Sequence, residues 1–194
     1  MVRARKAPTA AQQFLGPAGH EAHVEYLAQV LVNSLFVSQG HRDDVQLTFV
    51  FEASADYSRI IKFDGENLGS LSDQSEKGLL ELFALALKTS AGSGKGETRS
   101  VLPGVSVTAD SFESLIKSYQ TDRSIYLLDR KGEDVRESNL PENAVFVLTD
   151  HIPMPTKQAK SLVNRGAQAI SLGPKMLHAS QCVVLIQNEY DRMG

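Results

Sequence analysis

Three short apolar runs decide the fold class of this chain: SIYLL (residues 124–128), AVFVLT (144–149) and AQAISL (167–172). Continuous apolar runs of this length are typical of strands that are buried on both faces of a sheet. A helical pattern over residues 156–165 separates the second run from the third, and another over 174–192 follows the third. Strands that alternate with helices in this way predict an α/β fold, in which helices cover both faces of a largely parallel sheet.

The amino-terminal half adds further helices and strands to this pattern. Apolar residues at helical spacing predict helices over residues 20–37 and 72–88. Strand-forming residues fill VQLTFVF (45–51) and SRIIKF (58–63), and the Asp64–Gly65 pair that follows is typical of a hairpin turn. The whole chain therefore mixes helix and strand from end to end.

The composition bounds the kinds of protein that this chain can be. Its 194 residues are 42% hydrophobic and 22% charged, which fits a single globular domain over residues 1–194. One cysteine excludes a disulfide framework and a cysteine-based zinc cluster, and the five histidines show no ligand spacing, so no metal is expected. No apolar stretch is long enough to cross a membrane, and the basic start has no apolar segment behind it. We therefore expect a cytoplasmic protein with no membrane association.

The charge balance bears on the partners of the protein. The formal net charge is −3, so the chain as a whole offers no attraction to nucleic acid. Any binding of nucleic acid has to depend on local groups of basic side chains.

The segment AGSGKGET (91–98) superficially resembles a phosphate-binding P-loop but lacks its spacing. Thr89 stands where the first glycine belongs, and Gly96 follows Lys95 where a hydroxyl residue is required. A predicted helix precedes the segment, whereas a P-loop follows a strand. The sequence therefore predicts a polar surface loop over residues 90–100 and no NTPase activity.

Nucleophilic catalysis is not indicated either. The single cysteine, Cys182, lies inside the apolar run QCVVLI, which predicts a small buried side chain rather than a reactive thiolate. The chain has no G-x-S-x-G motif of the kind that carries a serine nucleophile.

Two segments follow the ends of predicted parallel strands, where α/β proteins bind their ligands: TDHIPMP (149–155) and SLGPKML (171–177). The second segment places apolar residues around Gly173 and free backbone amides. A single glycine is too few for a phosphate cradle. The segment therefore favours a flat apolar heterocycle held by main-chain hydrogen bonds, and an ordinary strand-to-helix turn is the alternative.

The same residues resemble a known family. LLDRKGEDV (127–135), VFVLTDHIPM (145–154) and ISLGPKMLHASQCVVLIQNEYDR (170–192) are similar to the carboxyl-terminal half of the TrmY-type pseudouridine N1-methyltransferases. Those proteins belong to the SPOUT superfamily of S-adenosylmethionine (SAM)-dependent RNA methylases. Weaker similarity at LVNSLFVSQGHRDDV (31–45) and IKFDGENL (61–68) extends it over most of the chain, which looks like a bacterial TrmY-like member.

The resemblance implies a fold, a cofactor and partners. It implies a carboxyl-terminal trefoil knot, a first strand over residues 1–7, SAM as cofactor, a homodimer, and RNA as substrate, with N1 of tRNA pseudouridine-54 as the site. Carried over to this sequence, the cofactor pocket comprises the residues Leu128, Thr149, Ser171, Leu172, Gly173, Pro174, Met176, Leu177 and Cys182.

Three departures from the family pattern concern the RNA surface and one pocket wall. Thr149 replaces a glycine of archaeal members, Asp43 replaces a second arginine after Arg42, and VSVTADSF (105–112) lacks an arginine pair. Fewer arginines weaken phosphate contacts, which set affinity for RNA. Two alternatives therefore stay open: a knotted dimer that binds SAM or RNA without methyl transfer, and methylation of another RNA site, such as one in rRNA.

Methyl transfer to a ring nitrogen requires that its proton be removed and that the nitrogen be aligned with the methyl group. Asp150 is the candidate for the proton, with capping of the next turn as the alternative role. Arg42 is the candidate for positioning RNA. Because the net charge is −3, RNA binding also requires a group of basic residues on one side of the dimer, drawn from Arg3, Arg5, Arg42, Lys95, Arg99, Arg123, Arg130 and Lys131.

Overall fold

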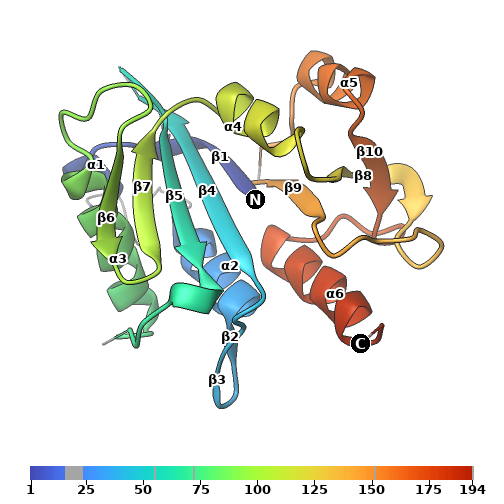
Figure 1. The fold of residues 1–194 in the computed structure, drawn as a ribbon, viewed down its shortest axis with the longest axis horizontal. Helices are drawn as coiled ribbons and strands as arrows, with labels where there is room; N and C mark the ends of the chain where they lie inside the picture. The colour runs from blue at the N-terminus through green and yellow to red at the C-terminus, as the bar shows by residue number, and fades with distance from the viewer. Residues whose placement is uncertain (16–23, 55, 72, 151, 194) are drawn as a thin grey trace.

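The computed structural model describes residues 1–15, 24–54, 56–71, 73–150 and 152–193. It contains one eight-stranded sheet, to which both halves of the chain contribute strands (Figure 1). Its spatial order is β10-β8-β9-β1-β4-β5-β7-β6. The strands are β1 (Val2–Pro8), β4 (Gln46–Ala53), β5 (Arg59–Asp64), β6 (Thr98–Leu102), β7 (Val105–Ala109), β8 (Ile125–Asp134), β9 (Val145–Thr149) and β10 (Gln168–Ser171). A small hairpin, β2 (Phe36–Val37) with β3 (Gly40–His41), stands apart from this sheet.

The sheet has a parallel part and an antiparallel part. The neighbouring pairs from β10 through β8, β9 and β1 to β4 are all parallel, and those from β4 through β5 and β7 to β6 are antiparallel. The expected α/β fold with a largely parallel sheet is thus confirmed for five of the eight strands. The resemblance also predicted the first strand correctly, since β1 lies between β9 and β4 and pairs parallel with both.

Helices cover both faces of the sheet, as the alternation of side chains along its strands requires. In β4, Phe49 and Phe51 belong to one apolar core, and Val50 between them belongs to a second core on the opposite face. The first core contains side chains of α1 (Ala11–Leu15), α2 (Glu25–Leu35), α3 (Glu76–Thr89) and α6 (Ala179–Asp191). The second core contains those of α4 (Phe112–Tyr119) and α5 (Thr156–Asn164).

The hairpin predicted at Asp64–Gly65 is wrong. Gly65 begins a short 3₁₀ helix (Gly65–Asn67), and β5 pairs with β4 on one side and β7 on the other. A Cβ atom on Gly65 would collide with the carbonyl oxygens of Arg42 and Val45. The glycine is therefore required by a close approach of two backbones rather than by a turn.

Two further expectations need correction. The loop predicted over residues 90–100 ends early, because β6 begins at Thr98 and forms the polar edge of the sheet. The last helix begins at Ala179 instead of residue 174, so Pro174 lies in the preceding loop. His178 caps the helix: its backbone N–H donates to Gln181 Oε1 at 2.9 Å, and Ala179 is the first helical residue.

The path of the chain through the parallel strands is not sequential. From β9 the chain passes through α5 to β10, which lies on the far side of β8. The trefoil knot implied by the resemblance stays a prediction.

Among the described residues, no helix has the length and apolar character needed to span a membrane.

Candidate cofactor site and RNA-binding surface

The carboxyl ends of the parallel strands meet at one edge of the sheet and carry most of the predicted cofactor residues. Thr149, the last residue of β9, is in register with Arg3 of β1, and Leu127 of β8 is in register with Val147 of β9. Leu128 follows Leu127, so it lies level with Leu148, one residue before the carboxyl end of β9. This is the edge at which parallel α/β sheets bind ligands.

Strand β8 leaves its partner β10 after Leu127 and pairs with it again at Glu133, with five unpaired residues between. Ala169 of β10 pairs with Leu127, but the next residue, Ile170, pairs with Glu133. At Gly132 the backbone of β8 comes close to β10 again. A Cβ at this position would lie 2.5 Å from backbone atoms of Ala169 and Ile170, so only glycine fits there. The excursion, residues 128–132, forms one side of the site next to the loop that follows β10.

The loop between β10 and α6, residues 172–178, offers free main-chain donors. The hydroxyl of Ser171 accepts a hydrogen bond from the N–H of Gly173 at 3.1 Å, which fixes the start of the loop. The N–H groups of Lys175, Met176 and Leu177 make no hydrogen bond to another described residue. Nothing lies within 4 Å of the position of a Cβ on Gly173, and Met176 is 77% exposed. The loop thus presents unpaired amides beside open space, which fits a heterocycle held by main-chain hydrogen bonds.

An apolar wall backs this loop. Leu128, Leu172 and Leu177 are partly buried and pack against the core to which Cys182 belongs. The Sγ atom of Cys182 lies 4.0 Å from the carbonyl oxygen of Leu177, and burial raises the pKa of the thiol. A thiol of this kind stays protonated and unreactive. The prediction of a small buried side chain at Cys182 is confirmed.

Asp150 follows β9 directly and is buried. One carboxylate oxygen accepts from the N–H of Arg5 at 3.1 Å, and the other accepts from the N–H of Ile152 at 2.8 Å. This is the turn-capping geometry that the sequence left as the alternative role. Each oxygen keeps a further lone pair, so the contacts do not prevent it from accepting a proton.

The sequence did not single out Tyr26 of α2, which lies close enough to Asp150 to feel its charge. Burial and the negative charge of Asp150 both raise the pKa of the Tyr26 phenol. A tyrosine on a helix face gives no local signal of this proximity, because the two residues lie 124 positions apart in the chain. His151, the other polar residue of the TDHIPMP segment, lies outside the described residues, as do His20 and His23.

Arg3 is part of the interior and not of a surface. Its side chain is 3% exposed and forms a two-point ion pair with Glu52, at 2.7 and 2.9 Å. It also donates to Gln158 Oε1 at 2.7 Å and lies 4.2 Å from the ring centre of Phe112. The guanidinium thereby ties β1 to β4, α4 and α5, and it has no free donor face for RNA.

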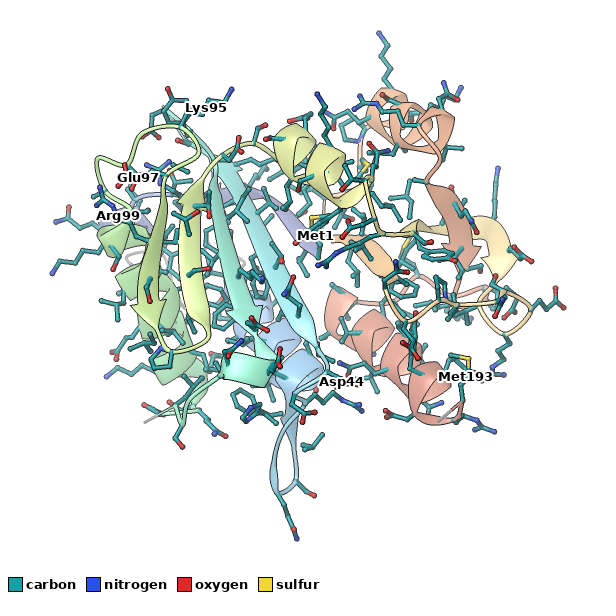
Figure 2. All side chains as sticks on the ribbon, viewed as in Figure 1. Met1, Asp44, Lys95, Glu97, Arg99 and Met193 are labelled. Carbon is teal, nitrogen blue, oxygen red and sulfur yellow. The ribbon has the colours of Figure 1, made fainter. Side chains whose placement is uncertain are left out.

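The basic residues proposed to contact RNA do not all form one group. Arg42 makes a two-point ion pair with Asp191 at the end of α6, with distances of 2.7 and 2.6 Å, at the opposite end of that helix from the cofactor loop. Arg99 pairs with Glu97 at 2.7 Å, and Figure 2 shows both beside Lys95 at the far edge of the antiparallel strands. Within one protomer, the eight predicted basic residues are therefore scattered. Arg42 as an RNA contact stays a prediction.

A smaller set of basic residues does lie at the carboxyl-end edge. These residues lie late in β1, in the excursion of β8, or in the loop before α6, and comprise Arg5, Lys6, Arg130, Lys131 and Lys175. All except the partly exposed Arg5 are exposed. They supply a local positive charge next to the candidate cofactor site in a chain of net charge −3.

Comparison with known proteins agrees with this geometry. A family model described as "Putative SAM-dependent RNA methyltransferase" matches residues 1–194. The chain belongs to this family of RNA methyltransferases. SAM is therefore the cofactor of this methyltransferase, and RNA is the class of its substrate.

Individual relatives of the methyltransferase cover nearly its whole length. A protein of Shewanella frigidimarina named "Putative pseudouridine methyltransferase" is 49% identical over 191 residues, which are 98% of this chain and 96% of that one. A protein of Vibrio parahaemolyticus with the same name is 47% identical over the same shares of the two chains.

A solved structure shares the fold of the methyltransferase. Nep1 of Archaeoglobus fulgidus, crystallised with S-adenosylhomocysteine, superposes with a TM-score of 0.58 at 12% identity, over 98% of this chain and 96% of its own. At that identity the likeness concerns the fold, which is the SPOUT fold implied by the sequence resemblance.

The residues present fit the cofactor. A purine needs hydrogen-bond partners along its edge and apolar contact on its faces. The unpaired amides of Lys175, Met176 and Leu177 offer the former, and Leu128 and Leu172 offer the latter. No group of three or more His, Cys, Asp or Glu residues could hold a metal ion in the part of the chain that the structure describes.

Proposed function

We propose that this protein transfers a methyl group from SAM to N1 of a pseudouridine in RNA. The observation that carries the proposal is the loop of residues 172–178, whose unpaired amides stand beside an apolar wall at the carboxyl ends of parallel strands. The names of the Shewanella and Vibrio relatives support pseudouridine as the nucleoside that is methylated. The family resemblance supplies the finer assignment, which is N1 of tRNA pseudouridine-54.

The residues of the loop have separate roles in this proposal. Ser171 holds the loop through Gly173 N–H, the amides of residues 175–177 donate to the purine, and Leu128 and Leu172 contact its faces. Thr149 and Pro174 form the remaining sides of the cofactor pocket, and Cys182 packs behind Leu177. Bound SAM supplies an electrophilic methyl group, and the chain's part is to hold it in line with the ring nitrogen and to exclude water.

Asp150 is proposed to take the proton from the pseudouridine N1. Replacing Asp150 by Asn is expected to lower kcat by about 10²–10⁴-fold, because the amide cannot act as a base. The Asn oxygen can still accept one of the two backbone N–H groups, so the free energy of unfolding should fall by only about 1 kcal/mol. Single-turnover kinetics, SAM titration and urea denaturation of the same variant measure these effects.

The combination of these measurements separates catalysis from capping. A fall in kcat with unchanged SAM affinity supports the proton role. A variant that keeps its kcat and is only destabilised would assign Asp150 to turn capping alone. The control is Asp110→Asn, since Asp110 also accepts a backbone N–H, from Ser111 at 2.7 Å, but precedes α4, away from the cofactor loop.

The assembly is part of the same proposal. A homodimer with a carboxyl-terminal trefoil knot would place the free basic residues of one protomer, such as Arg130 and Lys131, beside elements of its partner. RNA would then lie across both subunits, as the family resemblance implies, with phosphate contacts that set affinity.

The function is tested by mass spectrometry of nucleosides from tRNA and rRNA of cells with and without the gene. Loss of N1-methylpseudouridine from the tRNA fraction is expected, and the purified enzyme with SAM should restore it to that RNA. Loss from rRNA alone would replace the tRNA site by a ribosomal one. An unchanged nucleoside profile, together with SAM binding in calorimetry, would favour a dimer that binds without methyl transfer.

A further inference from the structure

A second cleft lies at the opposite end of the sheet from the cofactor loop. It is enclosed by the amino ends of β1, β4 and β9 and by the later turns of α6, and its inner part has a volume of about 540 Å³. An outer part of about 680 Å³ adjoins it and shares Asp44, Gln46, Arg123 and Glu142 with it. Small-molecule sites in proteins have volumes of about 300–1,000 Å³. The inner cleft is thus of the size that a small molecule fills.

The inner cleft is apolar. Seven apolar residues that are each less than 10% exposed line it: Met1, Leu47, Val145, Phe146, Leu148, Val183 and Ile186. The backbone nitrogen of Met1 donates to the carbonyl of Phe146 at 2.8 Å, so it already has a partner within the wall. The wall therefore favours an apolar group.

Two hydroxyl groups in the wall, that of the buried Thr48 and that of the half-buried Tyr119, have unused hydrogen-bonding capacity. Thr48 is 3% exposed, and its hydroxyl makes a single long contact of 3.4 Å, to the hydroxyl of Tyr119. Each hydroxyl has one donor and two acceptor sites, so both can also bond to a ligand in the cleft. The wall therefore offers a polar anchor as well as apolar contact.

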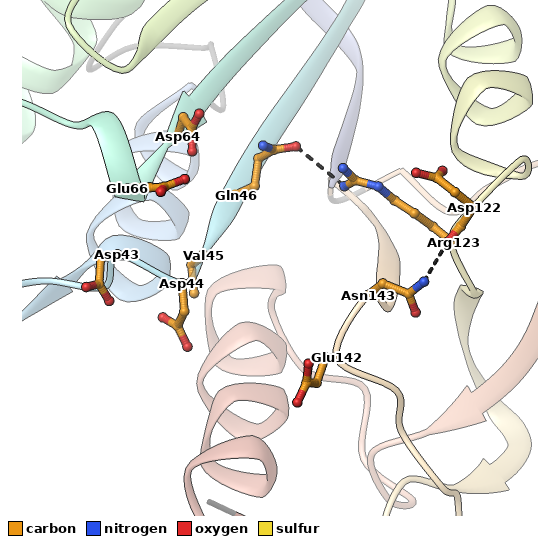
Figure 3. Close-up of a pocket in the computed structure, with 10 residues that line it drawn as sticks. All are labelled: Asp43, Asp44, Val45, Gln46, Asp64, Glu66, Asp122, Arg123, Glu142 and Asn143. Atoms are coloured by element: carbon orange, nitrogen blue, oxygen red, sulfur yellow. Dashed lines mark hydrogen bonds between the residues drawn. The ribbon is translucent and has the colours of Figure 1, made fainter.

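The opening of the cleft is strongly acidic. Figure 3 shows the carboxylates around it, with Asp44 and Glu142 coming from segments far apart in the sequence. The lining of the opening has one guanidinium, that of Arg123, which reaches Gln46 Oε1 at 3.5 Å and lies 4.7 Å from the ring centre of Tyr119. Arg42 at the inner edge is neutralised by Asp191. The carboxylates of the opening are Asp43, Asp44, Asp64, Glu66, Asp122 and Glu142.

This charge decides what can enter. Six carboxylates against one guanidinium repel the phosphates of RNA, so the cleft is not a continuation of the RNA-binding surface. The same charges attract a cation and raise its local concentration. An apolar wall behind an acidic opening therefore matches a molecule with an apolar body at one end and an ammonium group at the other.

We propose that this cleft binds a small organic amine, with its apolar body between β9 and α6 and its ammonium group among Asp44, Glu142 and their acidic neighbours. The proposal does not depend on the methyltransferase activity, because the cleft shares no residue with the cofactor loop.

A matched pair of probes tests the proposal. Tryptamine and 3-indolepropionate share the indole and differ in the charge of the chain end. Calorimetry and protein NMR should show tryptamine binding, with shifts at Val183 and Ile186, and should show 3-indolepropionate binding at least about tenfold more weakly. Raising the salt concentration should weaken tryptamine binding, because the charges at the opening are exposed.

Two variants separate charge from shape. The double substitution Asp44→Asn and Glu142→Gln should weaken tryptamine binding about tenfold, and Ala144→Leu should block it by filling the cleft with the charges intact. The control pair, Glu113→Gln with Glu137→Gln, makes the same change of charge at exposed sites elsewhere and should leave binding unchanged.

The proposal is overturned if the two probes bind equally, if the Asp44/Glu142 double variant binds tryptamine as the parent does, or if the shifts fall outside the cleft. If a peptide that contains Lys and Phe binds the cleft and tryptamine does not, the cleft is a protein-docking site and not an amine site. SAM affinity of the same variants is measured in parallel, so loss of cofactor binding is recognised separately.

Discussion

Replacing Leu172 by arginine is expected to weaken SAM binding by about 100-fold or more, because the longer charged side chain fills the space beside the apolar wall and brings an unpaired charge there. Leu172 is only partly buried, so the fold should tolerate the change. Calorimetry with SAM and with S-adenosylhomocysteine measures the affinity, and thermal denaturation shows whether the variant is folded.

Two matched variants serve as controls for the Leu172→Arg result. Leu172→Met keeps the volume and apolar character of the wall and should retain most of the affinity. Leu102→Arg makes the same change at an exposed leucine on the edge strand β6 and should leave SAM binding unaltered. If Leu172→Arg binds SAM as tightly as the parent protein does, the cofactor is not held by the loop between β10 and α6.

Replacing Arg3 by methionine is expected to lower the free energy of unfolding by about 3–5 kcal/mol, because it leaves the carboxylate of Glu52 partly buried without its partner. Gln158 and the ring of Phe112 lose their contact with the guanidinium at the same time. Urea denaturation followed by circular dichroism measures the change.

A compensating variant tests the cause. Arg3→Met combined with Glu52→Leu removes both charges and should recover most of the lost stability, since a well-packed apolar pair often replaces a buried ion pair without loss. Arg136→Met removes the exposed partner of Glu189 and should cost no more than about 1 kcal/mol. Equal losses in the Arg3 and Arg136 variants would show that Arg3 acts as a surface residue.

The parallel part of the sheet could be predicted from the sequence because its signals are local. The runs that became β8 and β9 are apolar enough to show burial on both faces without knowledge of their neighbours, whereas β10 proved to be an edge strand with Gln168 exposed. Strand β6 gave no such signal, since it follows a glycine-rich loop and its residues alternate between exposed and partly buried at the edge of the sheet. The requirement for Gly65 likewise comes from backbones that meet only in the folded chain.

The candidate site divides in the same way. Gly173 and its apolar neighbours lie together in sequence, so the spacing of SLGPKML indicated a ligand loop, and the family resemblance extended it to Leu128 and Cys182. The role of Arg3 could not be inferred, because its partners lie 49 and 155 residues away. Nor could the pairing of Arg42 with Asp191, which removes one predicted RNA contact from the free charges within a protomer.

Helix α6 begins directly after the cofactor loop and ends beside the acidic cleft, so a single stiff element forms a wall of each. Cys182 and Ile186 lie one turn apart on it, the first in the predicted cofactor pocket and the second in the wall of the cleft. Any displacement of the helix that one ligand favours must change the affinity for the other by the same factor, in both directions. A cycle of four titrations measures the coupling free energy that such a displacement would produce between the two sites.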